Sequence, residues 1–247
     1  MIRWYTSENH QTKNDLPMPY TKSIPWKFIS LFLIIIVAGK VCLAQQGTED
    51  FQVKGIPQKI SWQTAPQSWK CDGDQLTILA GAKTDLFLDP QNAYEIVNSP
   101  KAVFNPNDSF VLSARVRVDF NTDYDAGVLV LYADDKNWAK LCFEYSPQKI
   151  PFVVSVVNKG ISDDCNHVPV NGRAVFLRIA GLGNHIFAFH YSDDGEHWNL
   201  VRYFSLGNAS NVRVGFSSQS PTGSSCRAVF SGIRYRAHAL ADIRNGE

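Results

Sequence analysis

Patterns that mark several common chemistries are missing from this sequence. It has no Cys-x-x-Cys pair and no His/Cys ligand spacing, which disfavours a zinc site. It has no Gly-x-Ser-x-Gly elbow and no phosphate-binding glycine loop, so it indicates neither that type of hydrolase nor a nucleotide site. Lysine and arginine form no block and the formal net charge is +1, so we expect no nucleic-acid partner.

Long helical patterns and internal repeats are also missing. The chain contains no amphipathic helix of useful length, and the lack of repeats disfavours a propeller. Short apolar runs instead alternate with Gly, Pro, Asn and Asp, which predicts many short strands and an all-β sandwich or barrel. The expected strands are 75–80, 109–120, 127–132, 138–145, 152–158, 174–179, 185–192, 200–204, 212–217 and 228–236.

The N-terminal region is interpreted as a targeting segment. Residues 1–17 are polar and aperiodic, and we take them as a mis-annotated extension that precedes the real initiator, Met18. Residues 18–44 combine a basic flank, the apolar run 28–38 and a small residue, Ala44, which predicts a cleaved signal peptide. The apolar run is shorter than the about 20 residues of a membrane span, although a retained N-terminal anchor is the alternative. We therefore expect an exported protein, periplasmic or extracellular, without a stable membrane anchor after signal removal.

The remainder, roughly 200 residues, is enough for one substantial domain. Residues 45–59 are polar and interrupted by prolines, so we expect a lead-in. The sandwich domain is predicted over 60–236, and 237–247 are expected to form a C-terminal tail.

The stretch 138–145 is the most informative of the expected strands. Because successive side chains of a strand point to opposite faces, its two faces can be read separately. One face is apolar and looks like core: Ala139, Leu141, Phe143 and Tyr145. The other face places an aromatic ring, a cation and an acid in one row: Trp138, Lys140, Cys142 and Glu144. This second face is a candidate floor for a polar ligand such as a sugar.

A hairpin turn is predicted within residues 190–198. The pattern Asp193-x-Gly195-x-x-Trp198 is similar to the Asp-box, in which a carboxylate accepts backbone N–H groups and the Trp covers the turn. A ligand role for Asp193 or Trp198 is the alternative.

Four acids gather around the expected strand at Gly127: Asp123, Asp125, Asp134 and Asp135. Oxygen ligands of this kind can bind Ca²⁺, but the acids do not form an EF-hand loop. We interpret them as solvated loop acids and expect no cofactor, with Ca²⁺ as the alternative.

Glycoside hydrolysis requires two carboxylic acids that flank the scissile bond. Glu144 and Asp163 are the best candidates for one face, with Asp125 third. The Glu-x-Asp-x-x-Glu strand of concanavalin-like glucanases is missing, and a surface ion pair between Glu144 and Lys140 is the alternative. The pattern therefore leans away from an enzyme.

An ordered set of motifs extends over residues 60–236. It comprises Trp69-x-x-Asp72-Gly73-x-x-Leu76, Thr84-Asp85-x-Phe87, Tyr124-Asp125-x-Gly127, Trp138-x-Lys140-x-x-x-Glu144, Val153-Val154-Ser155-Val156 with Ser162-Asp163, Leu177-Arg178, Tyr191-Ser192-x-Asp194-Gly195-x-x-Trp198-x-x-x-Arg202 and Val214-Gly215-x-x-Ser217-x-x-Ser220-Pro221. The set resembles the family of unknown function represented by the "regulation of enolase" proteins. This resemblance implies a concanavalin A-like jelly-roll sandwich of two antiparallel sheets, as in lectins and glucanases. The chain departs from the family pattern at Cys165, where an aromatic residue commonly follows Ser-Asp, and at Tyr124–Gly127, which lacks the usual Gln.

Together these observations predict a shallow polar-aromatic cleft on the concave sheet that binds a glycan or another polar small ligand. Trp138 is expected to stack on a sugar face, while Lys140, Glu144 and Asp163 bind hydroxyl groups. The full set of predicted cleft residues is Asp125, Trp138, Lys140, Glu144, Asp163 and His190. The alternatives are a glycoside-active enzyme that uses Glu144, with Asp163 as its partner, and a non-catalytic structural or protein-interaction sandwich.

Four cysteines follow the expected signal peptide, and export permits disulfides. The first and last strands of jelly rolls commonly share a sheet, so we predict the pair Cys71–Cys226. A second pair, Cys142–Cys165, is the further hypothesis because these cysteines flank the expected strand 152–158. Free buried thiols are the alternative.

Overall fold

The computed structural model of the chain describes residues 49–247. The predicted extension, signal peptide and cleavage after Ala44 lie outside the described residues. Within the described part, no helix is long and apolar enough to cross a membrane.

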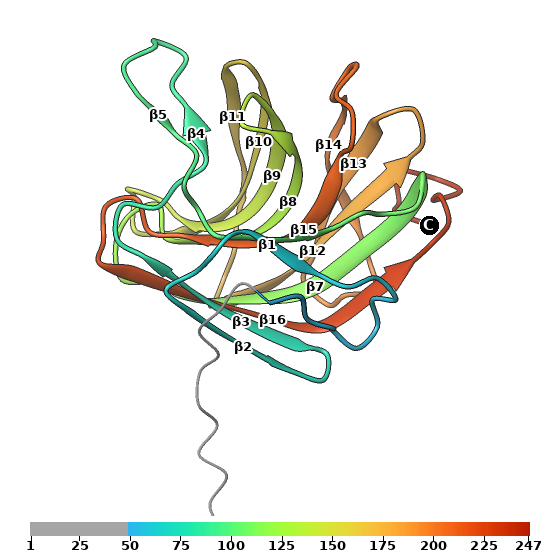
Figure 1. The fold of residues 1–247 in the computed structure, drawn as a ribbon, viewed down its shortest axis with the longest axis horizontal. Helices are drawn as coiled ribbons and strands as arrows, with labels where there is room; N and C mark the ends of the chain where they lie inside the picture. Colours follow the sequence, from blue (N-terminus) through green and yellow to red (C-terminus); the bar gives the residue numbers. More distant parts are fainter. Residues whose placement is uncertain (1–48) are drawn as a thin grey trace, which may run out of the picture. The chain divides into compact units, whose positions relative to one another are not determined.

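The described residues form two large antiparallel sheets packed face to face (Figure 1). The sheet that we call the cleft sheet has the order β1-β6-β15-β8-β9-β10-β11, and the back sheet has the order β14-β13-β12-β7-β16-β3-β2. The short strands β4 and β5 pair only with each other. The strands are β1 (Ser61–Thr64), β2 (Ser68–Asp72), β3 (Gln75–Gly81), β4 (Phe87–Leu88), β5 (Glu95–Ile96), β6 (Lys101–Phe104), β7 (Ser109–Asp119), β8 (Ala126–Asp134), β9 (Asn137–Tyr145), β10 (Pro151–Lys159), β11 (Ser162–Pro169), β12 (Ala174–Leu182), β13 (Ile186–Ser192), β14 (Asn199–Ser205), β15 (Arg213–Gln219) and β16 (Ser225–Arg236).

The main core lies between the two sheets and follows from strand alternation. In β7, Leu112, Ala114 and Val116 point inward and are buried, whereas Arg115 and Arg117 point outward and are exposed. Each expected strand of the sequence analysis coincides with a strand of the structure to within a few residues. The predicted all-β sandwich of two antiparallel sheets is therefore confirmed.

A second apolar cluster lies on the outer, concave face of the cleft sheet. Strand β8 is buried on both faces, which explains its continuous apolar run. Its outer side chains pack with those of β9 and β10 under residues 85–98, a segment that contains β4 and β5 and that we call the flap. The cluster comprises Leu86, Leu88, Val103, Ala126, Val128, Val130, Tyr132, Trp138, Cys142, Val154 and Val156.

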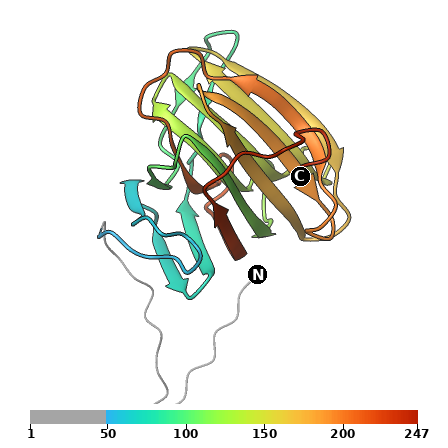
Figure 2. The ribbon, with the colours of Figure 1, turned by 90° about the vertical axis from the view of Figure 1, so that its right-hand side faces the viewer.

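Both ends of the described chain pack against the sandwich. Phe51 forms a β-bridge with Ile60, and Val53 and Ile56 are buried in the main core. At the other end, Leu240 and Ile243 pack on the outer face of the back sheet. Figure 2 shows this dark red C-terminal segment crossing the strands near the C label. The segments expected as lead-in and tail are therefore packed parts of the structure.

The two predicted disulfides are wrong, because all four described cysteines are free. Cys71 lies on β2 and Cys226 on β16, with β3 between them. Two strand spacings are about 10 Å, which exceeds the about 7 Å that a disulfide allows between Cα atoms. Cys142 on β9 pairs with Val154 of β10, and Cys165 on β11 pairs with the next residue of β10, Ser155. Because adjacent strand residues face opposite sides, the two cysteines lie on opposite faces of the sheet.

Candidate functional site

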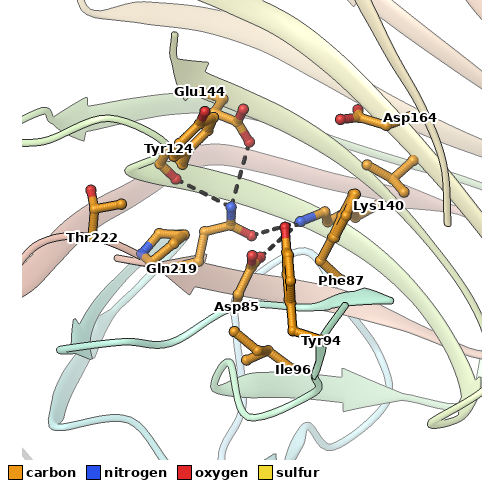
Figure 3. Close-up of a pocket in the computed structure, with 12 residues that line it drawn as sticks. Asp85, Phe87, Tyr94, Ile96, Tyr124, Lys140, Glu144, Asp164, Gln219 and Thr222 are labelled. Carbon is orange, nitrogen blue, oxygen red and sulfur yellow. Dashed lines mark hydrogen bonds and ion pairs between the residues drawn. The ribbon is translucent and has the colours of Figure 1, made fainter. Parts of the chain in front are cut away.

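A cleft of about 460 Å³ opens between the flap and the concave face of the cleft sheet (Figure 3). This volume lies within the range of small-molecule sites, roughly 300–1,000 Å³. The flap supplies one wall, strands β9, β10 and β11 the floor, and the segments before β8 and after β15 the far rim. The lining residues are Asp85, Phe87, Tyr94, Ile96, Tyr124, Lys140, Glu144, Val156, Asp164, Gln219, Pro221 and Thr222.

A chain of polar contacts crosses the floor of the cleft. The Lys140 Nζ atom lies 3.1 Å from Asp85 Oδ1 and donates to Gln219 Oε1 at 3.0 Å. The Gln219 amide in turn donates to Glu144 Oε2 at 3.4 Å and to the Tyr124 carbonyl at 3.2 Å. Figure 3 shows Gln219 at the centre of this network, between the lysine and the glutamate. Gln219 therefore connects the sheet to the rim, and Lys140 connects the sheet to the flap.

Lys140 is the charged centre of the network. Its side chain is 3% exposed and that of Asp85 is 13% exposed, so the pair is largely removed from water. Burial alone would lower the pKa of Lys140, but the negative charge of Asp85 and the nearby Glu144 carboxyl raise it above its usual value. The lysine is thus a permanent cation that depends on Asp85 for compensation.

Glu144 is held in an unusual protonation state. Burial raises its pKa to about 8, with Asp164 and Asp85 adding to the rise and Lys140 opposing it. At neutral pH the carboxyl group therefore retains its proton for most of the time. Asp164, which lines the same cleft from β11, also has a raised pKa, because desolvation outweighs the attraction of Lys140.

This raised pKa predicts a pH-dependent stability. Between pH 4.5 and about 8 the folded protein holds a proton on Glu144 that the unfolded chain has released, so its free energy of unfolding falls as the pH rises. We expect the stability of the wild type relative to Glu144→Gln to decline across this window and to level off above it. Urea denaturation of both proteins from pH 5 to 9 measures the difference in their free energies of unfolding. A difference that does not change with pH would contradict the raised pKa of Glu144.

Two exposed tyrosine rings border the cleft. Tyr94, on the flap, is 49% exposed and stacks on Phe87 with ring centroids 6.0 Å apart. Tyr124 is 41% exposed and has a left-handed backbone, with φ of 69°. Its N–H donates to the Tyr145 carbonyl at 2.7 Å, and its own carbonyl accepts from Gln219. Such a conformation in a residue with a bulky side chain needs support from its surroundings, and these bonds provide it.

The structure brings only part of the predicted site together. Lys140 and Glu144 do line the cleft, and alternation places Trp138 on the same face of β9. Trp138, however, is fully buried beneath the flap, and its indole N–H donates to the Asp135 carbonyl at 3.2 Å. The expectation that this ring stacks on a ligand is wrong, because no ring face reaches the solvent.

The other three predicted residues do not line the cleft. Asp125 is fully buried and accepts hydrogen bonds from the Asn121 and Thr122 backbone and from Ser220 Oγ, which fixes the turn before β8. Asp163 is exposed and pairs with Arg202 at 2.7 Å. Because adjacent strand residues face opposite sides, Asp164 enters the cleft instead. His190 lies on β13 of the back sheet, where its Nε2–H donates to the Ile243 carbonyl at 2.8 Å.

The predicted hairpin turn occurs after β13, but its carboxylate is Asp194 rather than Asp193. The Asp194 Oδ1 atom accepts from the backbone N–H groups of Glu196 and His197, both at 2.8 Å. Ser192 Oγ accepts from Gly195 N–H at 2.8 Å and donates to Asp194. Ser192, Asp194 and Gly195 therefore form a turn that its own hydrogen bonds stabilise.

The acids considered as Ca²⁺ ligands each have a structural partner. Asp123 pairs with Lys149, Asp134 accepts from the backbone of its own hairpin, and Asp135 accepts from the Tyr132 hydroxyl. Within residues 49–247, no group of three or more His, Cys, Asp or Glu side chains is arranged to hold a metal ion.

Sequence reasoning missed most of the cleft wall. Asp85, Tyr94 and Gln219 come from segments outside the expected strands or at their ends. Asp85 was part of the Thr84-Asp85-x-Phe87 motif, which was the one available signal. Strand β11, which carries Asp164, is a polar edge strand without apolar alternation and was not predicted.

Known proteins resemble this chain in sequence or in structure. "Regulation of enolase protein 1" of Saccharomyces cerevisiae is 23% identical over 172 residues, which cover 69% of this chain and 86% of the relative. A crystal structure of a functionally unknown protein from Saccharomyces cerevisiae has a TM-score of 0.67 at 22% identity, covering 73% of this chain and 97% of the other.

Larger glycoside hydrolases contain a similar sandwich. The GH43 BlXynB protein from Bacillus licheniformis has a TM-score of 0.55 at 18% identity, and the likeness covers 77% of this chain but only 38% of that enzyme. Xylan beta-1,4-xylosidase from Bacillus halodurans has a TM-score of 0.53 at 15% identity, covering 67% of this chain and 33% of the enzyme. Identities this low show a common fold alone.

The family match extends over residues 62–238 and so includes every residue that lines the cleft. The chain therefore belongs to the family described as protein of unknown function (DUF1349).

Proposed function

We propose that this chain is an exported carbohydrate-binding protein and that its ligand occupies the cleft between the flap and the cleft sheet. The observation that carries the proposal is the position of two exposed tyrosine rings, Tyr94 and Tyr124, beside a fixed polar floor. A sugar ring has apolar C–H faces and hydroxyl edges, so it fits a site with aromatic walls and convergent polar groups.

The polar floor supports the proposal because its groups are held in place before a ligand arrives. Lys140, Gln219 and Glu144 are fixed by one another and by Asp85, so binding would require little additional ordering. A protonated Glu144 can donate a hydrogen bond and Asp164 can accept one, which suits hydroxyl groups that do both. The sandwich that the chain shares with a xylan beta-1,4-xylosidase is compatible with this ligand class.

Export is the part of the proposal that rests on the N-terminal sequence alone. The apolar run 28–38 and the small residue Ala44 support it. Cell fractionation with N-terminal sequencing of the mature protein tests it, and a cytoplasmic protein with an intact N-terminus would exclude it.

Replacing the exposed rings tests the ligand site. We expect Tyr94→Ala and Tyr124→Ala each to weaken glycan binding by roughly fivefold, because a stacked aromatic contact contributes about 1 kcal/mol. A glycan array identifies the ligand, and isothermal titration then measures the affinities. Tyr203→Ala is the matched control, since Tyr203 is similarly exposed, at 51%, but lies on β14 of the back sheet.

If no glycan binds the wild type, or if Tyr203→Ala weakens binding as much as the cleft variants, the assignment of the site fails. Thermal unfolding checks that all three variants fold normally. We expect melting temperatures close to that of the wild type, because exposed side chains contribute little to stability.

Glycoside hydrolysis is the second candidate, and one observation favours it. Burial raises the pKa of Glu144 to about 8, which suits a general acid near neutral pH, and a second carboxyl group, Asp164, lines the same cleft. Release of reducing sugar from the bound glycan by the wild type, and its loss in Glu144→Gln with binding retained, would support an enzyme. Binding without release by the wild type would exclude it.

A further inference from the structure

The outer face of the back sheet carries a cluster of arginines that the proposed function does not use. Strand alternation directs Arg115 and Arg117 of β7, Arg178 of β12, and Arg227, Arg234 and Arg236 of β16 to this face. Two of them share an acid, because Asp119 lies 2.6 Å from Arg117 and 3.8 Å from Arg227. Arg234 and Arg236 form no ion pair with any residue in 49–247.

A β-bulge in β16 directs these two arginines outward. Ser231 is opposite Arg115 on β7 and Arg234 is opposite Ser113, so β16 has one more residue than β7 over this interval. Gly232, with φ of 57°, lies within the bulge. Before the bulge Phe230 points into the core, and after it Ile233 and Tyr235 do so. Without the extra residue, Arg234 and Arg236 would point into the sandwich, so the bulge is what places these two arginines on the outer face.

Arg178 lies level with Arg234 across the strand β7. On β7, Ser113 is opposite Arg178 on one side and Arg234 on the other. The guanidinium of Arg178 stacks on the Trp198 ring at 3.6 Å and donates to the Gly246 carbonyl. Its Nε–H group is buried without a hydrogen-bond partner among the described residues. The ring and the carbonyl therefore hold the guanidinium in position while one donor stays unused.

These side chains surround a small cavity of about 90 Å³. Its lining residues include Arg178, Arg234, Arg236, His238, Ser113 and Trp198, and Glu247 is the one acid among them. One water molecule needs a cavity of roughly 10–15 Å³. This cavity is several times larger, so it has room for a small anion. Burial and the charge of Arg236 lower the pKa of Arg178 to about 10, which indicates mutual repulsion that an anion would relieve.

We propose that this cavity binds an oxyanion, namely a phosphate or sulfate group. Guanidinium groups present paired N–H donors that match the geometry of such groups, and two further residues with donor groups line the cavity: Ser113, and Arg178 with its unpartnered Nε–H. The site lies on the back sheet, whereas the proposed glycan cleft lies on the opposite sheet. The two sites can therefore be tested independently.

Titration of the full chain with inorganic sulfate and phosphate tests the proposal. We expect both anions to raise the melting temperature and to shift the Arg178 Nε–H resonance, relative to chloride at equal ionic strength. Arg234→Gln with Arg236→Gln should weaken the affinity by roughly tenfold or more, because charge-assisted hydrogen bonds are lost. The matched control is Arg117→Gln with Arg227→Gln, which removes the same charge from the same face of the back sheet, one arginine from β7 and one from β16, but spares the cavity.

Two further arms identify the source of the oxyanion. Chondroitin sulfate presents sulfate groups on a chain, and vesicles of phosphatidylglycerol in phosphatidylcholine present lipid phosphates. Binding in any arm that requires Arg234 and Arg236 and survives the control substitutions supports the site. Equal responses of the two double variants in every arm, or an equal effect of chloride, would overturn it.

Discussion

Replacing Asp85 with alanine is expected to lower the free energy of unfolding by about 3 kcal/mol. The substitution leaves Lys140 buried without its principal counter-charge, and breaking a buried ion pair typically costs about 3–5 kcal/mol. We expect the lower end of this range, because Glu144 remains close and can ionise in response. Urea denaturation measures the change, and amide exchange of the flap should quicken because Asp85 connects it to β9.

A double variant separates the ion pair from packing. Asp85→Leu combined with Lys140→Met removes both charges and keeps the volume, so it should recover most of the lost stability. A loss below about 1 kcal/mol in Asp85→Ala, or a double variant no more stable than Asp85→Ala, would contradict the prediction. Either result would show that the Asp85–Lys140 ion pair does not hold the flap on the sheet.

Replacing Trp138 with alanine should have the largest effect, a loss of roughly 3–5 kcal/mol. The ring is fully buried in the cluster beneath the flap, so its removal leaves a large cavity and frees the Asp135 carbonyl. Trp138→Phe is the matched control: it keeps an aromatic ring, loses the hydrogen bond and should cost less than the alanine variant.

The same variants distinguish a packing role from a ligand role. Because Trp138 does not line the cleft, we expect Trp138→Phe to bind the ligand with unchanged affinity. Unchanged stability together with lost binding would restore the original expectation that this ring contacts a sugar.

Particular residues show how much of the site can be predicted from the sequence. Alternation in 138–145 correctly placed Lys140 and Glu144 on one face, because the direction of a strand side chain is a local property. The same alternation placed Trp138 on that face but gave no sign of its burial. The cover is the flap, whose Asp85 is 55 positions from Lys140 in the chain, and no local pattern reports such a contact.

By itself, the sequence determined the fold class, the strand positions and two residues of the cleft floor, because periodicity and turn residues encode these locally. The tertiary structure decided which face is covered, that Asp164 rather than Asp163 enters the cleft, and that Tyr94, Tyr124 and Gln219 complete it. It also separated the cysteines and moved His190 to the back sheet. These outcomes depend on strand order and on long-range packing, which arise only when distant segments meet in the folded sandwich.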